Sequence, residues 1–421
     1  MPSYAKRAFK YRFYPTDTQA AELARTFGCV RKVYNMALAA RTEAWTLRQE
    51  RVNYNATSSM LTAWKKTEEL AFLNDVSSVP LQQALRHLQT AFTHFFAKRA
   101  KYPRFKSRKR SRPSAEYTTS AFRFRDGELT LAKMDQPLDI VWSRQLPASA
   151  QPSTVTVSQD RVGRWFVSLL VEDPTIRPLP ANGKTVGVDA GLDHLLTLST
   201  GEKITNPRHE RKDRAQLARA QREMSRKAEG DGANRAKARR RVARIHARIA
   251  DRRRDTLHKI TTRLVRDNQV VVIEDLAVRN LLKNGRLARA ISDAAWSDFR
   301  SMLEYKAQWY GREVIAVDRW FPSSRLCSHC GALAGRMPLN VRTWTCESCG
   351  TTHDRDVNAA RNLLAAGLAV SACGAGVRPQ RSTPGGQSAL KQETHGATRG
   401  TPSGGGGASQ QMLLEAPAAA P

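Results

Sequence analysis

The chain has 421 residues, with 69 Lys and Arg against 38 Asp and Glu and a formal net charge of +31. A chain of this length can hold two or three domains with a large core, and its excess of positive charge indicates a polyanionic partner such as nucleic acid. The sequence has no run of about 18 apolar residues, and its first residues, MPSYAKRAFKYRF, lack the apolar segment of a signal peptide. We therefore expect no membrane partner and a cytoplasmic, nucleoid-associated protein.

The N-terminal part predicts an antiparallel β-domain interrupted by helices. Residues 4 to 14, YAKRAFKYRFY, alternate aromatic and basic side chains, which is typical of a strand. Apolar residues then recur at helical spacing, and strand signals with alternating apolar residues, such as TVTVS and WFVSLLV, come after them. We expect residues 1–15 and 114–175 to form a small β-barrel, and residues 16–113 to form a helical insertion into it.

A polar, basic and proline-containing segment, KYPRFKSRKRSRP, spans residues 101 to 113. In a nucleic-acid contact, the cations would bind phosphates and the aromatic rings would stack on bases. A solvated linker would need the charged side chains but not the aromatic rings. We favour a nucleic-acid contact, with the solvated linker as the alternative. The candidate contact residues are Lys101, Tyr102, Arg104, Phe105 and Lys106.

An apolar stretch at residues 184 to 198, KTVGVDAGLDHLLTL, carries one carboxylate, Asp189, in its middle. A buried acid loses its hydration unless a positive group lies against it, so such a strand indicates either a metal ligand or an acid that caps a turn. A second apolar stretch, NQVVVIEDLAV, also ends in acid, at Glu274 and Asp275. A third acidic group, in HDRDVNAARNLL at residues 353 to 364, begins a predicted helix.

Three carboxylates from two strands and a helix are the ligands that a two-metal phosphodiesterase requires. Mg²⁺ and Mn²⁺ prefer hard oxygen ligands, and two such ions flank a scissile phosphate about 3.5–4 Å apart. Strands and helices alternate from residue 184 onward, which indicates an α/β layer fold. Asp318 also ends a predicted strand and is a spare candidate, although we favour a turn or salt-bridge role for it.

A strongly basic stretch, at residues 207 to 266, lies between the two carboxylate strands. Its apolar residues recur at helical spacing, which predicts a long helix or a helical hairpin whose turn is AEGDGAN. A charge run is usually only a solvated face. Because this run is nearly all cationic, we favour contact with nucleic acid, and the candidate residues are Arg239, Arg240 and Arg241.

Four of the six cysteines form two CxxC pairs, each followed directly by Gly. The spacing matches a zinc ribbon, in which each pair approaches one structural ion from a tight turn that Gly permits. Zinc would supply about 10–16 kcal/mol of folding free energy to a segment too small to have a core. Two disulfides are the weaker alternative, and the histidines His329 and His353 are spare because four thiolates complete a tetrahedron. The four ligands are Cys327, Cys330, Cys346 and Cys349.

The last stretch, from residue 371 to Pro421, is rich in Gly, Ser, Pro, Ala and Gln and contains Cys373. Such a composition cannot bury enough apolar surface to offset the entropy of ordering the chain. We expect this stretch to be disordered and assign it no chemistry.

The order of these features resembles the TnpB (OrfB) family of insertion-sequence-encoded proteins, which are compact relatives of the type V CRISPR effector nucleases. The resemblance runs from residue 4 to residue 370. The segments that carry it are QQALRHLQTAFTHFFAKRAKYPRFKSR, GVDAGLDHLLTLSTGE, VVVIEDLAVRNLLKN, AISDAAWSDFRSMLEYKAQWYGREVIAVDRWFPSSRLCSHCG and WTCESCGTTHDRDVNAARNLL.

The resemblance implies an RNA-guided DNA endonuclease. Its nuclease domain would be RuvC-like, of ribonuclease H-like fold, over residues 184–370, with the zinc ribbon inserted at 323–352. The N-terminal barrel would be the wedge-like domain, and the helical insertion would be the recognition domain. The implied partners are a guide RNA transcribed from the transposon end and a double-stranded target DNA that is cut beside a short motif read by the protein.

The family's catalytic, Mg²⁺-binding or Mn²⁺-binding positions match Asp189, Glu274 and an Asp of DRDVNAARN. We favour Asp356 over Asp354, because the Asp of D-x-N-A-A is the family's most regular element. Asp354 then suits a capping role at the helix N-terminus. Two rival functions are a transposase proper and a non-cleaving RNA-guided DNA-binding regulator, and the intact acidic trio weighs against the regulator.

Overall fold

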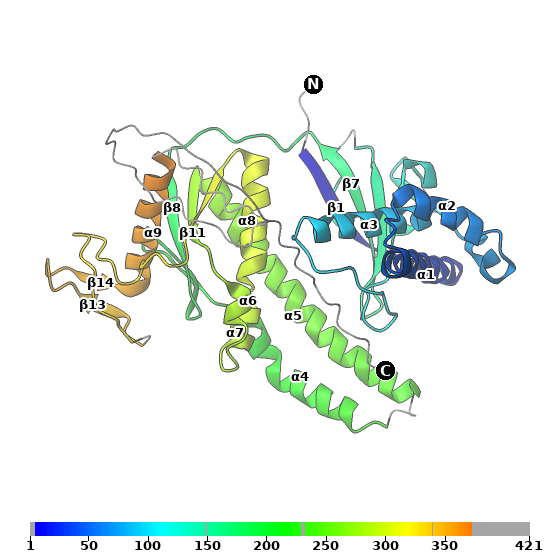
Figure 1. Cartoon of the computed structure of the whole chain (residues 1–421). Coiled ribbons are helices and arrows are strands. Elements are labelled where there is room, and N and C mark those ends of the chain that lie inside the picture. The colour runs from blue at the N-terminus through cyan, green and yellow to red at the C-terminus, as the bar shows by residue number, and fades with distance from the viewer. Residues whose placement is uncertain (1–4, 148–149, 229–231, 339, 373–421) are drawn as a thin grey trace, which may run out of the picture. The chain divides into compact units, whose positions relative to one another are not determined.

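The computed structural model describes residues 5–147, 150–228, 232–338 and 340–372 (Figure 1). Contacts within the chain group Met1–Pro384 into one unit, and a second unit, Gly385–Pro421, lies outside the described residues. The tail that we expected to be disordered, with Cys373, therefore also lies outside them, apart from the end of the last helix at Ala372.

The N-terminal part contains a five-stranded antiparallel sheet of order β2-β6-β7-β1-β5. In β1, the aromatic residues Phe9, Tyr11 and Phe13 are buried while Lys10 is exposed, as alternation along a strand requires. A separate hairpin pairs β3 with β4. The bounds are β1 (Ala5–Tyr14), β2 (Ser114–Thr118), β3 (Phe122–Arg125), β4 (Glu128–Leu131), β5 (Asp139–Val141), β6 (Thr154–Gln159) and β7 (Trp165–Asp173).

The antiparallel pairing agrees with the sequence analysis, but closure into a barrel is not confirmed. The strands β2 and β5 are the two edges of the described sheet. Alternation of apolar and polar residues predicts which face of a strand is buried, and it carries no information on which strands pair at the edges.

Helices lie between β1 and β2 in the chain. The first one begins with a capping box, in which the Thr16 hydroxyl accepts from the backbone N–H of Gln19 and the Gln19 side chain accepts from the backbone N–H of Thr16. The third buries Leu81, Leu85 and Leu88 on one face, as expected. The bounds are α1 (Asp17–Arg48), α2 (Tyr54–Trp64), α3 (Ser78–Phe96), and the 3₁₀ segments η1 (Glu68–Asn74) and η2 (Thr119–Ala121), the latter after β2.

The second sheet has the order β10-β9-β8-β11-β12. Strands β8, β11 and β12 run parallel, while β9 pairs antiparallel with both β8 and β10. Parallel strands are buried on both faces, which is why VVVIE and EVIAV read as continuous apolar runs. The bounds are β8 (Thr185–Ala190), β9 (His194–Leu198), β10 (Lys203–Thr205), β11 (Val270–Glu274) and β12 (Glu313–Val317).

Helices cover both faces of this sheet, which is the α/β layer arrangement expected from the sequence. Val271 and Ile273 of β11 pack in the cluster that includes residues of α5 and α8. Val272, between them, packs in the cluster that includes Leu363 of α9. The helical bounds are α4 (His209–Ser225), α5 (Gly232–Asp267), α6 (Val278–Leu281), α7 (Ala288–Ala294), α8 (Trp296–Tyr310) and α9 (Arg355–Ala372).

Two glycines let α9 lie directly on the sheet, where Figure 1 shows it beside β8. A Cβ atom on Gly187 of β8 would come within 2.0 Å of the Ala360 carbonyl oxygen. A Cβ atom on Gly367 of α9 would come within 2.5 Å of Val272 Cγ1. Any side chain at either position would therefore push the helix away from the strands.

The basic stretch folds as a helical hairpin, because α4 and α5 pack together through Leu217, Ala220, Ile245 and Ile249. Residues 229–231 of the expected turn lie outside the described residues. After β12, a small hairpin pairs β13 (Thr343–Thr345) with β14 (Thr352–Asp354). Among the described helices, none combines the length and the apolar character needed to cross a membrane.

Candidate active site and metal centre

Asp189 and Glu274 lie at the same edge of the second sheet. Strands β8 and β11 are parallel, and their register pairs Val188 with Ile273, the residues directly before the two acids. Glu274 itself lies opposite Val317, the last residue of β12. The carboxyl ends of the parallel strands meet at this edge. Open α/β sheets usually bind ligands at the carboxyl ends of their strands.

Asp356 comes to the same edge from α9. It is the second residue of that helix, which packs on β8 at Gly187. The carboxyls of Asp356 and Glu274 are near enough to Asp189 for their charges to act on it. Three predicted site residues from β8, β11 and α9 are therefore brought together.

Burial and neighbouring carboxylates dominate the electrostatics of Asp189 and Glu274. Burial, and then the neighbouring carboxylates of Asp356 and Glu274, raise the pKa of Asp189 to about 7, against weaker opposing effects of Arg355 and Arg342. Burial, and then Asp275, raise the pKa of Glu274. Carboxylates that resist ionisation in this way are stabilised when a cation binds between them.

Asp354 and Asp356 have different surroundings. Asp354 Oδ1 accepts from the backbone N–H groups of Asp356 and Val357, at 3.1 and 3.0 Å, which makes it the N-terminal cap of α9. Its Oδ2 accepts from Lys203 Nζ at 2.5 Å. Burial acts to raise the pKa of Asp354, but the hydrogen bond from Lys203 and the cap outweigh it, and the pKa is lowered.

Asp275 and Asp318, the two other acids at the strand ends, are used within the protein. Asp275 forms ion pairs with Arg300 and Arg319, one to each carboxylate oxygen. Burial acts to raise the pKa of Asp275, yet these two hydrogen bonds lower it overall. Asp318 Oδ1 accepts from the backbone N–H of Trp320 at 2.8 Å, the turn role that we favoured.

The four cysteines lie together, as their spacing predicts. Their sulfur atoms lie within 4.8 Å of one another, and all four thiols are free of disulfides. Gly331 and Gly350, directly after the two pairs, have φ angles of +77° and +69°, and their N–H groups donate to the carbonyls of Cys327 and Cys346. Two tight turns thus present four sulfurs to one point, and the cluster is compatible with zinc.

Over the part of the chain that the structure describes, these four cysteines are the one group of three or more His, Cys, Asp or Glu side chains gathered around a single point.

Several residues of the ribbon were missed by the sequence analysis. His353, which we took as spare, has its Nε2 3.0 Å from Cys327 Sγ and its ring tilted against Trp344. Asn358 of α9 accepts from the Ser328 N–H at 2.9 Å and donates to the Leu326 carbonyl at 2.7 Å.

Asn362, one turn further along α9, donates to the carbonyls of Ser323 and Leu326 at 2.8 and 2.6 Å. Both asparagines are buried. The two amides are spaced by four residues and so lie on one face of the helix, but this spacing does not indicate which residues of the ribbon they contact. The first turn of the ribbon is thus fastened to the helix that carries Asp356.

The candidate nucleic-acid residues of the N-terminal part differ in exposure. Lys101, Tyr102, Arg104 and Phe105 are exposed. The Tyr102 hydroxyl is hydrogen-bonded to Thr42 at 2.8 Å, and its ring meets Phe92 and Phe95 edge-on.

Lys106 is partly buried, with its ammonium 3.9 Å from the Tyr34 ring centre. On α5, Arg239, Arg240 and Arg241 are all exposed, and Arg241 pairs with Glu223 at 2.8 Å. The exposed cations on α5 therefore lie on the solvent side of the helical hairpin.

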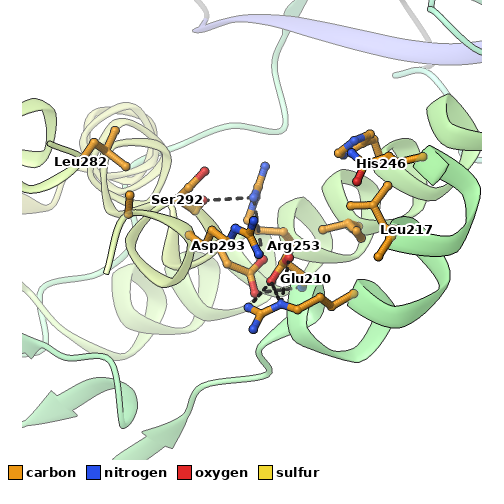
Figure 2. A pocket seen from close by; sticks show the side chains of 13 residues that line it. Glu210, Leu217, His246, Arg253, Leu282, Ser292 and Asp293 are labelled. Atoms are coloured by element: carbon orange, nitrogen blue, oxygen red, sulfur yellow. Dashed lines mark hydrogen bonds and ion pairs between the residues drawn. The ribbon is translucent and has the colours of Figure 1, made fainter. Parts of the chain in front are cut away.

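A cavity of about 620 Å³ lies among α4, α5 and the segment of α7 (Figure 2). Two hydrogen bonds connect the helices around the cavity. Asp293 Oδ2 accepts from the Glu210 N–H at 2.9 Å, and Arg253 donates to the Ser292 carbonyl at 3.1 Å. Its lining includes none of the three candidate carboxylates. The cavity is therefore separate from the acidic edge of the sheet.

Comparison with known proteins identifies the family. Residues 168–285 match the family model described as "Probable transposase" (OrfB of IS605), residues 296–363 match the Cas12f1-like TNB domain, and residues 1–50 match a helix-turn-helix domain model. A protein of Streptomyces pristinaespiralis named as an RNA-guided DNA endonuclease is 71% identical over 96% of this chain and 100% of its own length. The Escherichia coli protein InsQ, also named as an RNA-guided DNA endonuclease, is 37% identical over 92% of this chain and 97% of its own.

A solved structure is similar in fold. A Cas12f1 chain, determined in a complex with guide RNA and target DNA, covers 86% of this chain and 99% of its own length, with 13% identity and a TM-score of 0.54. The order of the acids, the four-cysteine ribbon and the full-length match to both relatives agree with one another. The chain belongs to the TnpB (OrfB) family of insertion-sequence-encoded proteins, relatives of the type V CRISPR effectors.

Proposed function

We propose that this protein is an RNA-guided DNA endonuclease encoded by a transposable element, and that Asp189, Glu274 and Asp356 form its cleavage site with two divalent ions. One observation carries the proposal: three acids from β8, β11 and α9 meet at the carboxyl edge of a partly parallel sheet. The names of its full-length relatives support the same activity.

The donor set fits Mg²⁺ or Mn²⁺. Carboxylate oxygens are the hard ligands that these ions prefer, and three of them leave positions for water and for phosphate oxygens. Bound divalent ions supply an activated water and stabilise the leaving oxygen of the phosphodiester.

The other residues at this edge hold the ligands in place. Asp354 caps α9 and so fixes the first turn, from which the Asp356 side chain projects. The two arginines that bind Asp275 fix the end of β11 beside Glu274. Both acids that neighbour a ligand in sequence thus have their oxygens engaged, which supports Asp356 and Glu274 as the ligands.

The same proposal assigns the domains. Residues 184–370 form a RuvC-like nuclease domain of ribonuclease H-like fold, with a zinc ribbon at 323–352. Residues 1–15 and 114–175 form the wedge-like domain, and residues 16–113 form the recognition insertion. The net charge of +31 suits a protein that binds both a guide RNA from the transposon end and double-stranded target DNA. Such a protein acts at the nucleoid.

The test is cleavage by the chain purified together with RNA from its transposon end. Sequencing the RNA that co-purifies identifies the guide, and a plasmid with a matching target and a library of adjacent sequences then reports cutting. We expect Mg²⁺-dependent or Mn²⁺-dependent cleavage by the native chain. Asp189→Ala, Glu274→Ala and Asp356→Ala should each abolish it, while target binding is kept.

The outcomes separate the rival functions. Cleavage by the triple alanine variant would refute the assigned site. Guided binding without cutting at any Mg²⁺ or Mn²⁺ concentration would identify a regulator, and covalent joining of donor to target by this protein alone would identify a transposase.

A further inference from the structure

Trp320 lies shortly after the carboxyl edge of the second sheet, and its side chain is 84% exposed. It follows β12, the strand whose last residue, Val317, lies opposite Glu274. We propose that the indole of Trp320 stacks on an unpaired base of the DNA strand that enters the carboxylate site, and so holds that strand for cutting. This inference rests on the proposed nuclease function and adds a base-binding residue to it.

The main chain before Trp320 is fixed to the end of β11. Arg319 forms an ion pair with Asp275, the residue directly after Glu274. The backbone N–H of Asp275 donates to the Val317 carbonyl at 2.9 Å. The segment that leads to Trp320 is therefore tied to the strand that carries a candidate metal ligand.

The main chain after Trp320 is fixed as well. Asp318 closes the turn, because its carboxylate accepts from the N–H of Trp320 at 2.8 Å and its carbonyl accepts from the N–H of Phe321 at 3.1 Å. Phe321 packs against the apolar cluster that joins β11, β12 and α9. The Ser323 carbonyl accepts from Asn362 of α9 at 2.8 Å. Both sides of the turn are thus engaged in the fold, while the indole projects into solvent.

A single exposed apolar side chain is common on protein surfaces and by itself indicates no partner. Trp320 differs in two respects. Among the large apolar side chains of the described residues it has the largest exposed fraction, and it lies at the edge where the candidate ligands meet. A rigid ring on a fixed main chain also loses little conformational entropy when it binds, because few side-chain torsions have to be ordered.

A nucleobase is the partner that fits an isolated indole. Every base has a π face, and one aromatic ring is enough to bind one base by stacking. A protein partner needs a broader apolar surface. Over residues 311–332, all of which the structure describes, no other large apolar side chain is exposed, and the exposed neighbours Asp318 and Arg319 are charged.

The stack would supply a contact that the carboxylates lack. Metal ions bind the strand at its phosphate and leave the bases free to move, whereas a base held on the indole fixes the strand at a second point. Two such points keep the phosphate in the geometry that cleavage requires. Because guide pairing holds the rest of the target, loss of the stack slows cutting without weakening target binding.

The first measurement combines Trp320→Ala with the removal of single bases. Single-turnover cleavage by the ribonucleoprotein is measured on targets in which each nucleotide around the cut is replaced, one at a time, by an abasic residue. We expect Trp320→Ala to lower the rate on the intact target by about 5-fold to 150-fold, the range for loss of one base–aromatic stack. At one position, the abasic residue should slow the native protein by the same factor and should not slow Trp320→Ala further.

Two results of this cycle would overturn the proposal: cutting by Trp320→Ala at the native rate, or effects of variant and abasic residue that add at every position. Trp45→Ala, at an exposed tryptophan of α1, is the matched control, and any effect it has should add to every abasic effect.

Conservative variants separate stacking from folding. Trp320→Phe should keep most of the native rate, whereas Trp320→Leu, which is apolar but has no ring, should cut as slowly as Trp320→Ala. Because the indole is exposed, all three should keep one zinc per chain and the native thermal unfolding. If Trp320→Ala does not fold, the other two variants decide, and equal rates for them would overturn the proposal.

The second measurement does not depend on cleavage. The full chain carrying Asp189→Ala is assembled with guide RNA and with targets that carry 5-iodo-deoxyuridine at successive positions around the expected cut. Ultraviolet light joins this base to an aromatic side chain stacked on it, and mass spectrometry identifies the peptide. We expect a crosslink at Trp320 that is absent in Trp320→Leu. Crosslinks only to other residues would overturn the proposal.

The failures are distinct. Cleavage by Asp189→Ala would refute the proposed site of the nuclease. A native chain that crosslinks at Trp320 but does not cut would refute the proposed function and keep the base-binding role. A native chain that cuts, with no crosslink at Trp320 and additive abasic effects, would refute only the role of Trp320.

Discussion

The cysteine ribbon and the carboxylate site gather their ligands in opposite ways. The ribbon takes four sulfurs from two short turns, and the local sequence almost alone brings them within 4.8 Å of one another. The carboxylate site takes one acid from each of β8, β11 and α9, so that the whole nuclease sheet must fold before the acids meet. The ribbon should therefore depend on its metal for folding, whereas the carboxylate site should fold first and acquire its metals afterwards.

Removal of zinc gives the largest expected effect. Cys346→Ser, or chelation, should unfold the ribbon, because a structural zinc supplies about 10–16 kcal/mol to such a segment. Hydrogen exchange should become fast over the ribbon, and zinc content should fall from one per chain. Cys29→Ser, at a buried cysteine of α1, is the control and should keep its zinc. A ribbon that stays protected without metal would break the contrast with the carboxylate site.

Changing pH in EDTA tests the carboxylate site without its metals. Burial, with Asp356 and Glu274, raises the pKa of Asp189 from its ordinary value of 3.8 to about 7 in the folded chain. Between these values the folded state binds more protons than the unfolded state, so stability should fall as pH rises from 4 to 7. At 1.36 kcal/mol per pKa unit, the loss is at most about 4 kcal/mol.

Asp189→Asn removes this penalty and should make the metal-free chain more stable than the native one at pH 8, as thermal unfolding in EDTA would report. Added Mg²⁺ should stabilise the native chain and leave the variant unchanged. A native chain that gains stability as the pH rises through 7 would contradict the assigned cause.

Asn358→Ala tests the contact between the two sites. It leaves the Ser328 N–H without its partner, which costs about 1–3 kcal/mol, whereas the Leu326 carbonyl keeps the hydrogen bond from Asn362. We expect faster zinc loss to a chelator and a slower cleavage step. Asn55→Ala, the same change at an exposed position of α2, should alter neither rate. Identical zinc release from the two variants would mean that the ribbon and α9 act independently.

Asp354→Ala gives the smallest effect. It removes the cap of α9 and should cost about 1 kcal/mol of stability. The ion pair with Lys203 is also lost, so cleavage should be slower than in the native chain. Cleavage should persist in this variant, whereas Asp356→Ala should abolish it. Asp255→Ala, at an exposed acid of α5, is the control for the loss of one charge. Full loss of cleavage in Asp354→Ala would exchange the roles of the two acids.

The contrast between the sites also explains what the sequence could predict. The gathering of the four cysteine sulfurs could be predicted from the sequence, because each CxxC pair and the Gly after it encode a local turn. The acids Asp189 and Glu274 could be picked out because Asp189 interrupts an apolar stretch and Glu274 ends one. Their meeting depends on strand order, which the apolar pattern does not contain.

The contributions of Arg342, Asn358 and His353 could not be predicted, because their partners lie in other elements. Arg342 meets Asp193 across 149 residues of sequence, and Asn358 meets Ser328 across 30. The sequence around a polar residue does not indicate a partner that is so far away in the chain. Apolar residues at helical spacing, in contrast, predict core positions without any knowledge of their partners.

The close contact of α9 with β8 at Gly187 fixes how far Asp356 stands from Asp189. No rotamer intervenes in this spacing, because main chain touches main chain there. The absence of a side chain at Gly187 therefore sets the separation between Asp189 and Asp356, which are far apart in the sequence. Adding a single methyl group there, as in Gly187→Ala, would shift one acid relative to the other while leaving every charged group chemically intact.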